Sequence, residues 1–171
     1  MIFRDKYWTE SFLKDLEFTR SFGDVAFIAK SVIKTIPKPV FGLSAPLTTG
    51  GYGLENNTKI IEQSVFKLES FGFNVFNFIP LSVGLIPLIE DWNKNNKDYC
   101  MPVIEITYRQ IFESRLLEII FSIPRKKFSI GAGRESEILS ELRIPVLEFP
   151  TGWYLEILSK LNLEYSKRRK L

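Results

Sequence analysis

With 171 residues, of which 45% are hydrophobic and 15 are phenylalanine, the chain is long enough to bury the core of one domain. Its net charge of +3 is too small to indicate nucleic-acid binding, and it contains no run of ~18 apolar residues, so no membrane partner is expected. Histidine is absent and Cys100 is the single cysteine, which excludes an internal disulfide and every catalytic arrangement built on histidine.

The remaining chemistry must therefore come from carboxylates, tyrosine, lysine, serine or backbone groups. We expect no cofactor and no metal ion. The first residues lack the apolar stretch of a signal peptide, and we therefore expect a cytoplasmic location.

Residues 1–37 predict a helical extension to the main domain. Apolar side chains at helical spacing predict a first helix over residues 8–20, and Asp24 is the expected cap of a second. Pro37 and Pro39 should end this second helix.

Strands and helices alternate in residues 38–171, the main domain. The apolar pattern predicts strands over 40–44, 73–78, 117–121 and 144–147, and helices over 56–71 (stopped by Gly72), 85–92, 103–115, about 130–142 and 152–161. Such alternation requires a mainly parallel sheet covered on both faces, with right-handed crossovers. The predicted fold class is therefore α/β and doubly wound, of the Rossmann or flavodoxin-like type, with an N-terminal helical extension.

Two loops follow predicted strands and carry the residues of interest, Ser44–Gly51 and Ser129–Glu135. In doubly wound sheets, ligands bind beyond the carboxyl ends of the strands, so we predict that these loops face one another across one crevice. A glycine-containing turn before a helix offers free N–H groups and a positive dipole to an anion such as phosphate. Glu135 lies about one turn into that helix, close to whatever the loop holds.

Each of these features also has an ordinary structural explanation when it is taken alone. The first loop would serve as a turn, and Glu135 would be a solvated residue that the helix dipole favours. Tyr108 would be half-buried packing, and Asp91 and Asp98 would belong to a polar loop, although either of them would also serve as a proton donor.

In combination, the two loops resemble those of nucleoside 2-deoxyribosyltransferase-like proteins. The resemblance covers about residues 39–150 and rests on Ser44-Ala-Pro-Leu-Thr-Thr-Gly-Gly51, and on Ser129-x-Gly-Ala-x-x-Glu135 followed by Arg143-Ile-Pro-Val. It implies cleavage or exchange of the N-glycosidic bond of a nucleoside or nucleotide, with Glu135 as the nucleophile at the anomeric carbon. It also implies a homodimer or larger homo-oligomer.

The same resemblance suggests where a 5′-phosphate or sugar would bind. These residues are Ser44, Thr48, Thr49, Gly50, Gly51, Ser129, Gly131 and Arg134, with Tyr108 and Asp91 as further candidates.

The chain departs from the family pattern in several places. Transferases that act on free nucleosides carry an aspartate where Ser129 stands, and relatives often have an arginine at the position of Gly133, whereas here it is Arg134. Basic Lys126 and Lys127 replace acidic or aromatic residues, which favours a phosphorylated ligand. The leading hypothesis is thus an N-glycosidase, or an N-deoxyribosyl or ribosyl transferase. The alternatives are a non-catalytic nucleotide-sensing module and a structural subunit with an empty crevice.

Overall fold

The computed structural model describes residues 5–47, 52–124 and 130–164. Within these residues, four strands form one parallel sheet in the order β2-β1-β3-β4. The strands are β1 (Val40–Ser44), β2 (Asn74–Phe76), β3 (Ile119–Ser122) and β4 (Val146–Glu148). The strand order reverses between β1 and β3, as in flavodoxin-like sheets, which confirms the predicted doubly wound α/β class.

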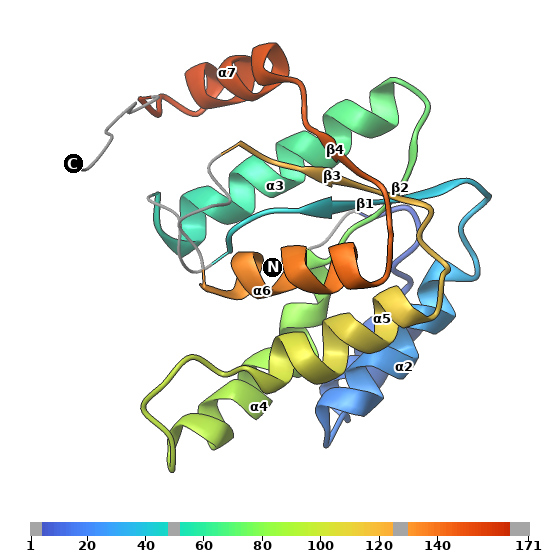
Figure 1. Cartoon of the computed structure of the whole chain (residues 1–171), viewed down its shortest axis with the longest axis vertical. Coiled ribbons are helices and arrows are strands. Elements are labelled where there is room, and N and C mark those ends of the chain that lie inside the picture. The colour runs from blue at the N-terminus through green and yellow to red at the C-terminus, as the bar shows by residue number, and fades with distance from the viewer. Residues whose placement is uncertain (1–4, 48–51, 125–129, 165–171) are drawn as a thin grey trace.

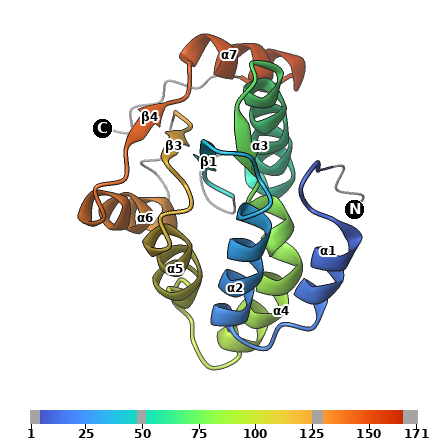
Figure 2. The same ribbon diagram turned by 90° about the vertical axis from the view of Figure 1, so that its right-hand side faces the viewer.

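Helices cover both faces of the sheet, as Figures 1 and 2 show. One face carries α3 (Gly53–Ser70) and α7 (Thr151–Lys160). The other carries α1 (Glu10–Glu17), α2 (Phe22–Ile33), α4 (Ser82–Asn93), α5 (Arg109–Glu113) and α6 (Ile130–Glu141), together with the short helices η1 (Ile79–Leu81) and η2 (Val103–Tyr108). Among the described residues, no helix combines the length and the apolar character that a membrane span requires.

The alternation of side chains along β1 divides the core into two layers. Val40 packs into the layer beneath α2, whereas Phe41 and Leu43 pack into the layer beneath α3 and α7. Gly42 faces the layer beneath α2. A Cβ at this position would lie 2.5 Å from Cδ1 of Ile120, so only glycine lets β3 pack this closely. The continuous apolar run of this strand is thus explained by burial on both faces.

The N-terminal helices share the core of the sheet. Leu16, Val25 and Val32 are completely buried, in the same layer as residues of β1 and β3. The prediction that Asp24 caps α2 is wrong. Ser21 is the N-cap, and its hydroxyl accepts a hydrogen bond from the backbone N–H of Asp24 at 3.1 Å. Asp24 instead lies in the first turn and accepts from the N–H of Arg20, a hydrogen bond that lowers the pKa of its carboxyl.

Several helix boundaries differ from the sequence pattern. Helix α3 begins three residues earlier than predicted, at Gly53, and its end is confirmed: Gly72 has φ +87°, and the next N–H bonds back to Leu68. The expected helix 103–115 is in fact two helices, the π-helix η2 and then α5. A π-helical turn holds an extra residue per turn, which apolar spacing alone does not reveal.

Candidate functional site

A cavity of about 450 Å³ lies at the carboxyl-terminal edge of the sheet, on the side of α4 and α6. Its wall includes Ala45, Pro46 and Leu47 from the loop after β1, and Gly131, Ala132 and Glu135 from the start of α6. The predicted second loop is wrong in this respect, because its residues from Ile130 onward belong to α6; the loop after β1 and the start of α6 share one crevice. The rest of the wall comes mainly from α4 and η2 and is largely apolar: Phe78, Ile79, Leu85, Ile86, Ile89, Val103 and Ile104.

Glu135 is the buried charged residue of this wall, with only 6% of its surface exposed. It lies in the second turn of α6, and its carboxyl contributes to raising the pKa of both Tyr99 and Tyr108, after the larger effect of burial. A carboxylate thus stands close to two phenols inside an apolar cavity. Perturbed titratable groups gathered in a cleft are typical of functional sites, although packing produces them too.

Tyr99 is a site residue that the sequence analysis missed. Its ring packs against Gly131, where a Cβ would lie 2.8 Å from Cζ of Tyr99 and closer still to the hydroxyl. The absence of a side chain at Gly131 therefore admits the phenol to the first turn of α6, next to Glu135. The glycine is visible in the sequence, but its aromatic neighbour comes from a loop about thirty residues away.

Tyr108 reaches the cavity from the end of η2. Its ring stacks on Phe78, with centroids 5.2 Å apart and an angle of 10° between the planes, and both residues line the cavity. The π-helix turns Val103, Ile104 and Tyr108 to the cavity and leaves Glu105 on the outer side, facing α6. Such π-helical segments occur often at functional sites.

The loop after β1 is held by α3. Asn57 is buried and donates from Nδ2 to the carbonyl oxygen of Leu47 at 2.8 Å. Ser44, at the end of β1, is 3% exposed, does not line the cavity, and its hydroxyl has no hydrogen-bond partner among the described residues. Of the other expected binding residues, Thr48, Thr49, Gly50, Gly51 and Ser129 lie outside the described residues.

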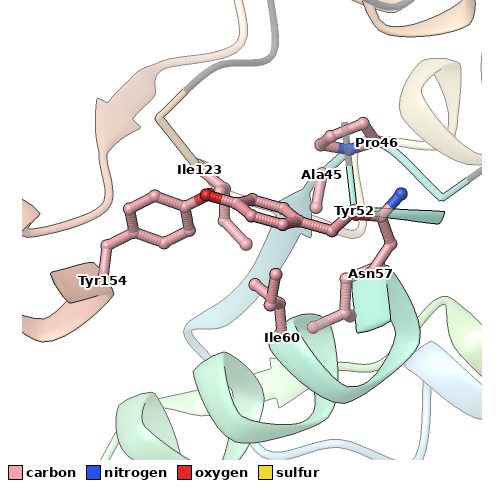
Figure 3. Close-up of a pocket in the computed structure, with 8 residues that line it drawn as sticks. Ala45, Pro46, Tyr52, Asn57, Ile60, Ile123 and Tyr154 are labelled. Carbon is pink, nitrogen blue, oxygen red and sulfur yellow. The ribbon is translucent and has the colours of Figure 1, made fainter. Parts of the chain in front are cut away.

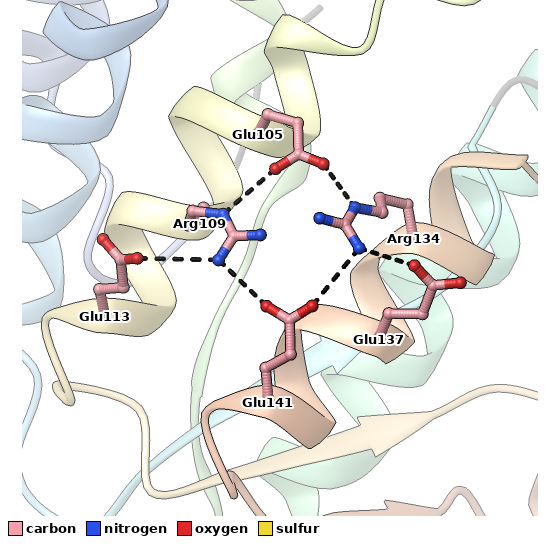
Figure 4. A network of polar contacts seen from close by, with 6 residues as sticks. All are labelled: Glu105, Arg109, Glu113, Arg134, Glu137 and Glu141. Carbon is pink, nitrogen blue, oxygen red and sulfur yellow. Dashed lines mark hydrogen bonds and ion pairs between the residues drawn. The ribbon is translucent and has the colours of Figure 1, made fainter.

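Arg134 does not line the cavity. Its guanidinium pairs with Glu105 of η2, with Glu137 at 2.7 Å and with Glu141 at 3.5 Å, in the network of Figure 4. The hydrogen bond to Glu105 is the largest of the effects that raise the pKa of Arg134 and lower that of Glu105. The arginine thus joins α6 to η2, and an expected role as a phosphate ligand would require it to leave these carboxylates.

The two aspartates of the expected polar loop differ in position. Asp91 is exposed, pairs with Lys94 at 3.0 Å and does not line the cavity. Asp98 does line it, and its side chain is exposed at the edge. The structure therefore brings Asp98, and not Asp91, to the same cavity as Glu135.

A second hollow lies on the other side of Ala45 and Pro46. Figure 3 shows the rings of Tyr52 and Tyr154 directed toward one another across it, above Asn57 and Ile60. Its volume of about 10 Å³ holds at most one water molecule. Of these two hollows, the larger one has room for an organic ligand.

The described residues contain no group of three or more acidic or cysteine side chains arranged to hold a metal ion. Comparisons of the chain with protein-family models, with curated proteins and with solved structures gave no match. What the site offers is one buried carboxylate, two phenols and an apolar wall at the sheet edge where doubly wound proteins bind their ligands.

Proposed function

We propose that this protein is an N-glycosidase, or an N-ribosyl or deoxyribosyl transferase, that acts on a nucleoside or nucleotide. The observation that carries the proposal is the buried carboxylate of Glu135 in a cavity large enough for a sugar and a base. The family resemblance of the two loops gives the reaction class, and the position of Glu135 is compatible with it.

The reaction has a simple physical description. As the C–N bond breaks, its electron pair leaves with the base and positive charge develops on the sugar ring. The Glu135 carboxylate stabilises this charge and forms an ester with the anomeric carbon, which water or a second base then opens. The apolar wall excludes bulk water, so the charge of the carboxylate is less screened than in solution.

A neutral base needs a proton as it departs, and the site limits which group supplies it. The raised pKa values of Tyr99 and Tyr108 make both phenols weaker acids than tyrosine in water, so they serve better as hydrogen-bond donors. Asp98 is the acidic residue at the edge of the cavity and is the proposed proton donor. The resemblance assigns the sugar phosphate mainly to residues 48–51 and to Ser129, which lie outside the described residues.

The test is release of free base from a panel of nucleosides and nucleoside monophosphates, followed by chromatography. Glu135→Gln should lower the rate by on the order of 10³-fold or more, because the amide cannot form the ester. Glu90→Gln, an exposed glutamate of α4, is the matched control and should keep the rate of the parent protein. Equal rates for the parent and Glu135→Gln, with both folded, would refute the assignment.

The second candidate is a nucleotide-binding module without catalysis. Two observations favour it: the two partly buried phenols have raised pKa values, and the proposed proton donor, Asp98, is exposed. Calorimetry and the release assay separate the two functions, since a sensor binds a nucleotide of the panel without releasing its base.

The location and the assembly of the protein complete the proposal. We place its function in the cytoplasm and expect a homodimer or larger homo-oligomer, as the family resemblance implies. Density-gradient or cell-fractionation experiments with the full chain test the first of these, and sedimentation tests the second.

A further inference from the structure

Helix α4 presents an aliphatic surface to the cavity. Residues at the spacing of one helix face, i, i+4, i+7 and i+11, line the cavity: Ser82, Ile86, Ile89 and Asn93. Leu85 lines it beside them. The polar residues of this face stand at its two ends, whereas Leu85, Ile86 and Ile89, which we call the α4 stripe, occupy its middle. A ligand therefore meets hydrocarbon along the central part of α4.

The opposite face of α4 is the one that packs against the protein. Gly84 lies about half a turn from Ser82 around the helix axis. It is buried, and a Cβ there would lie 3.1 Å from the carbonyl oxygen of Leu16. The N-terminal helices therefore hold α4 by this face and leave the stripe partly uncovered, since Ile86 is 48% exposed. An exposed isoleucine on a cavity wall becomes more favourable when an apolar part of a ligand covers it.

The helix η2 adds further aliphatic surface to the same cavity. Its Val103 and Ile104 are buried and line the wall. Helices α4 and α6 stand apart in both views of the molecule (Figures 1 and 2), and both line the cavity. The cavity thus extends from Glu135 on α6 to the α4 stripe.

The proposed function places the base of the ligand in this extension. With the anomeric carbon beside Glu135, the base occupies the part of the cavity beyond α6, where Phe78 and Tyr108 offer aromatic surface to a flat ring. The edge of an unmodified base carries donors and acceptors, which lose their hydrogen bonds with water when they face hydrocarbon. An alkyl group gains there instead, because each methylene group removed from water strengthens binding by up to about fourfold.

We propose that the ligand of this cavity is a nucleoside or nucleotide whose base carries an aliphatic substituent, and that the α4 stripe binds this substituent. The inference rests on the proposed function for the position of the sugar, and it adds the substrate class. From Leu85 to Ile89, α4 rises by about 6 Å, which matches a substituent of about five carbon atoms. Because Ser82 and Asn93 bound the stripe, a longer chain should gain nothing further.

Calorimetry with the full chain tests the proposal. The ligands are adenosine 5′-monophosphate and its derivatives with a methyl, propyl, pentyl or heptyl group on the exocyclic amino nitrogen. The affinity should rise with chain length, and the pentyl derivative should bind at least about tenfold more tightly than the unsubstituted nucleotide. The heptyl derivative should bind no more tightly than the pentyl derivative. Equal affinities across the series, or tightest binding of the unsubstituted nucleotide, would overturn the proposal.

Variants of α4 locate the substituent. Ile86→Gln puts a polar group into the stripe at a half-exposed position, where the fold tolerates it, and should remove most of the difference in affinity between the pentyl derivative and the unsubstituted nucleotide. Ile86→Leu keeps the apolar surface and should keep this difference. Leu155→Gln, at a partly exposed position of α7 that does not line the cavity, is the matched control and should keep it too. A difference that survives Ile86→Gln would show that the substituent does not lie on α4, contrary to the proposal.

Release of free base from the same series separates this inference from the function on which it rests. Affinity that rises with chain length, without release of base from any nucleotide, would support the apolar subsite and overturn the glycosidase. Release of base together with equal affinities across the series would leave the glycosidase intact and overturn the substrate class. Neither binding nor release with any nucleotide would overturn both.

Discussion

At the scale of single residues, the contact between Gly131 and Tyr99 gives a sharp prediction. Gly131→Ala puts a Cβ where the phenol lies, so we expect a loss of about 1–3 kcal/mol of stability or a displaced Tyr99. Gly133→Ala is the matched control on α6: it meets nothing within 4 Å and should gain up to about 1 kcal/mol from helix propensity. Urea denaturation of both variants measures the difference, and equal stabilities would show that Tyr99 does not pack there.

The hydroxyl of Ser44 leads to a second prediction at this scale. It is buried at the end of β1 and has no hydrogen-bond partner among the described residues. Removal of an unsatisfied buried group should not cost stability, so Ser44→Ala should be neutral or more stable by up to about 1–2 kcal/mol. Because Ser44 does not line the cavity, the same variant should bind a ligand there as tightly as the parent does. Thermal denaturation and calorimetry give the two values, and a clear loss of stability would mean that the hydroxyl has a structural partner.

At the scale of elements, the ion-pair network of Arg134 holds α6 against η2. The two helices carry Glu135 and Tyr108, so their relative position sets the geometry of the cavity. These carboxylates and arginines are partly exposed, so we expect no large gain in stability from the network. Its main effects should be to fix the position of α6 against η2 and to make the stability of the fold depend on pH.

The pH dependence follows from the lowered pKa of Glu105. A carboxyl with a lowered folded-state pKa stabilises the fold fully above its ordinary value of 4.5, and this contribution is lost as the pH falls through the folded-state value. On acidification from about pH 7 to about pH 3, the free energy of unfolding of Arg134→Gln should therefore fall less than that of the parent. Lys94→Gln, which breaks the exposed pair with Asp91, is the control and should follow the parent. Identical acid profiles for Arg134→Gln and the parent would show that the network does not contribute.

At the scale of the whole molecule, the proposed homo-oligomer predicts a contact between two copies, and we expect it at an edge of the sheet. β2 and β4 are the two edge strands of the described sheet, and Val146 and Leu147 of β4 are 44% and 46% exposed on opposite faces. An exposed apolar edge strand pairs readily with another strand, and lysine on an edge prevents this. Sedimentation should show a dimer or larger for the parent and a monomer for a variant with Val146→Lys and Leu147→Lys.

The control for the edge is Phe27→Lys on α2, a helix that packs against α1, α4, α5 and η2; the Phe27 side chain is 68% exposed. It should keep the assembly of the parent. A parent protein that sediments as a monomer would contradict the proposed oligomer, and a dimer that survives both lysines would place the interface elsewhere.

Local patterns in the sequence determine the main elements of this protein and the outline of its fold. The buried run 40–44, the helix stop at Gly72 and the alternation of strands with helices each depend on neighbours in the chain, so the parallel sheet could be predicted. The position of Glu135 near the start of a helix that follows a strand was predictable for the same reason. The π-helix at 103–108 and the cap at Ser21 were not, since hydrogen-bond geometry, not apolar spacing, decides them.

Only the tertiary structure decides what surrounds Glu135. Tyr99 comes to Gly131 from a distant loop, Phe78 stacks on Tyr108 from another element, and Arg134 turns to Glu105 instead of to the cavity. These contacts join residues about thirty positions apart, and apolar periodicity contains no information on which side chains meet. The chain thus specifies a carboxylate at the edge of the sheet, whereas packing determines that this carboxylate is buried close to two phenols.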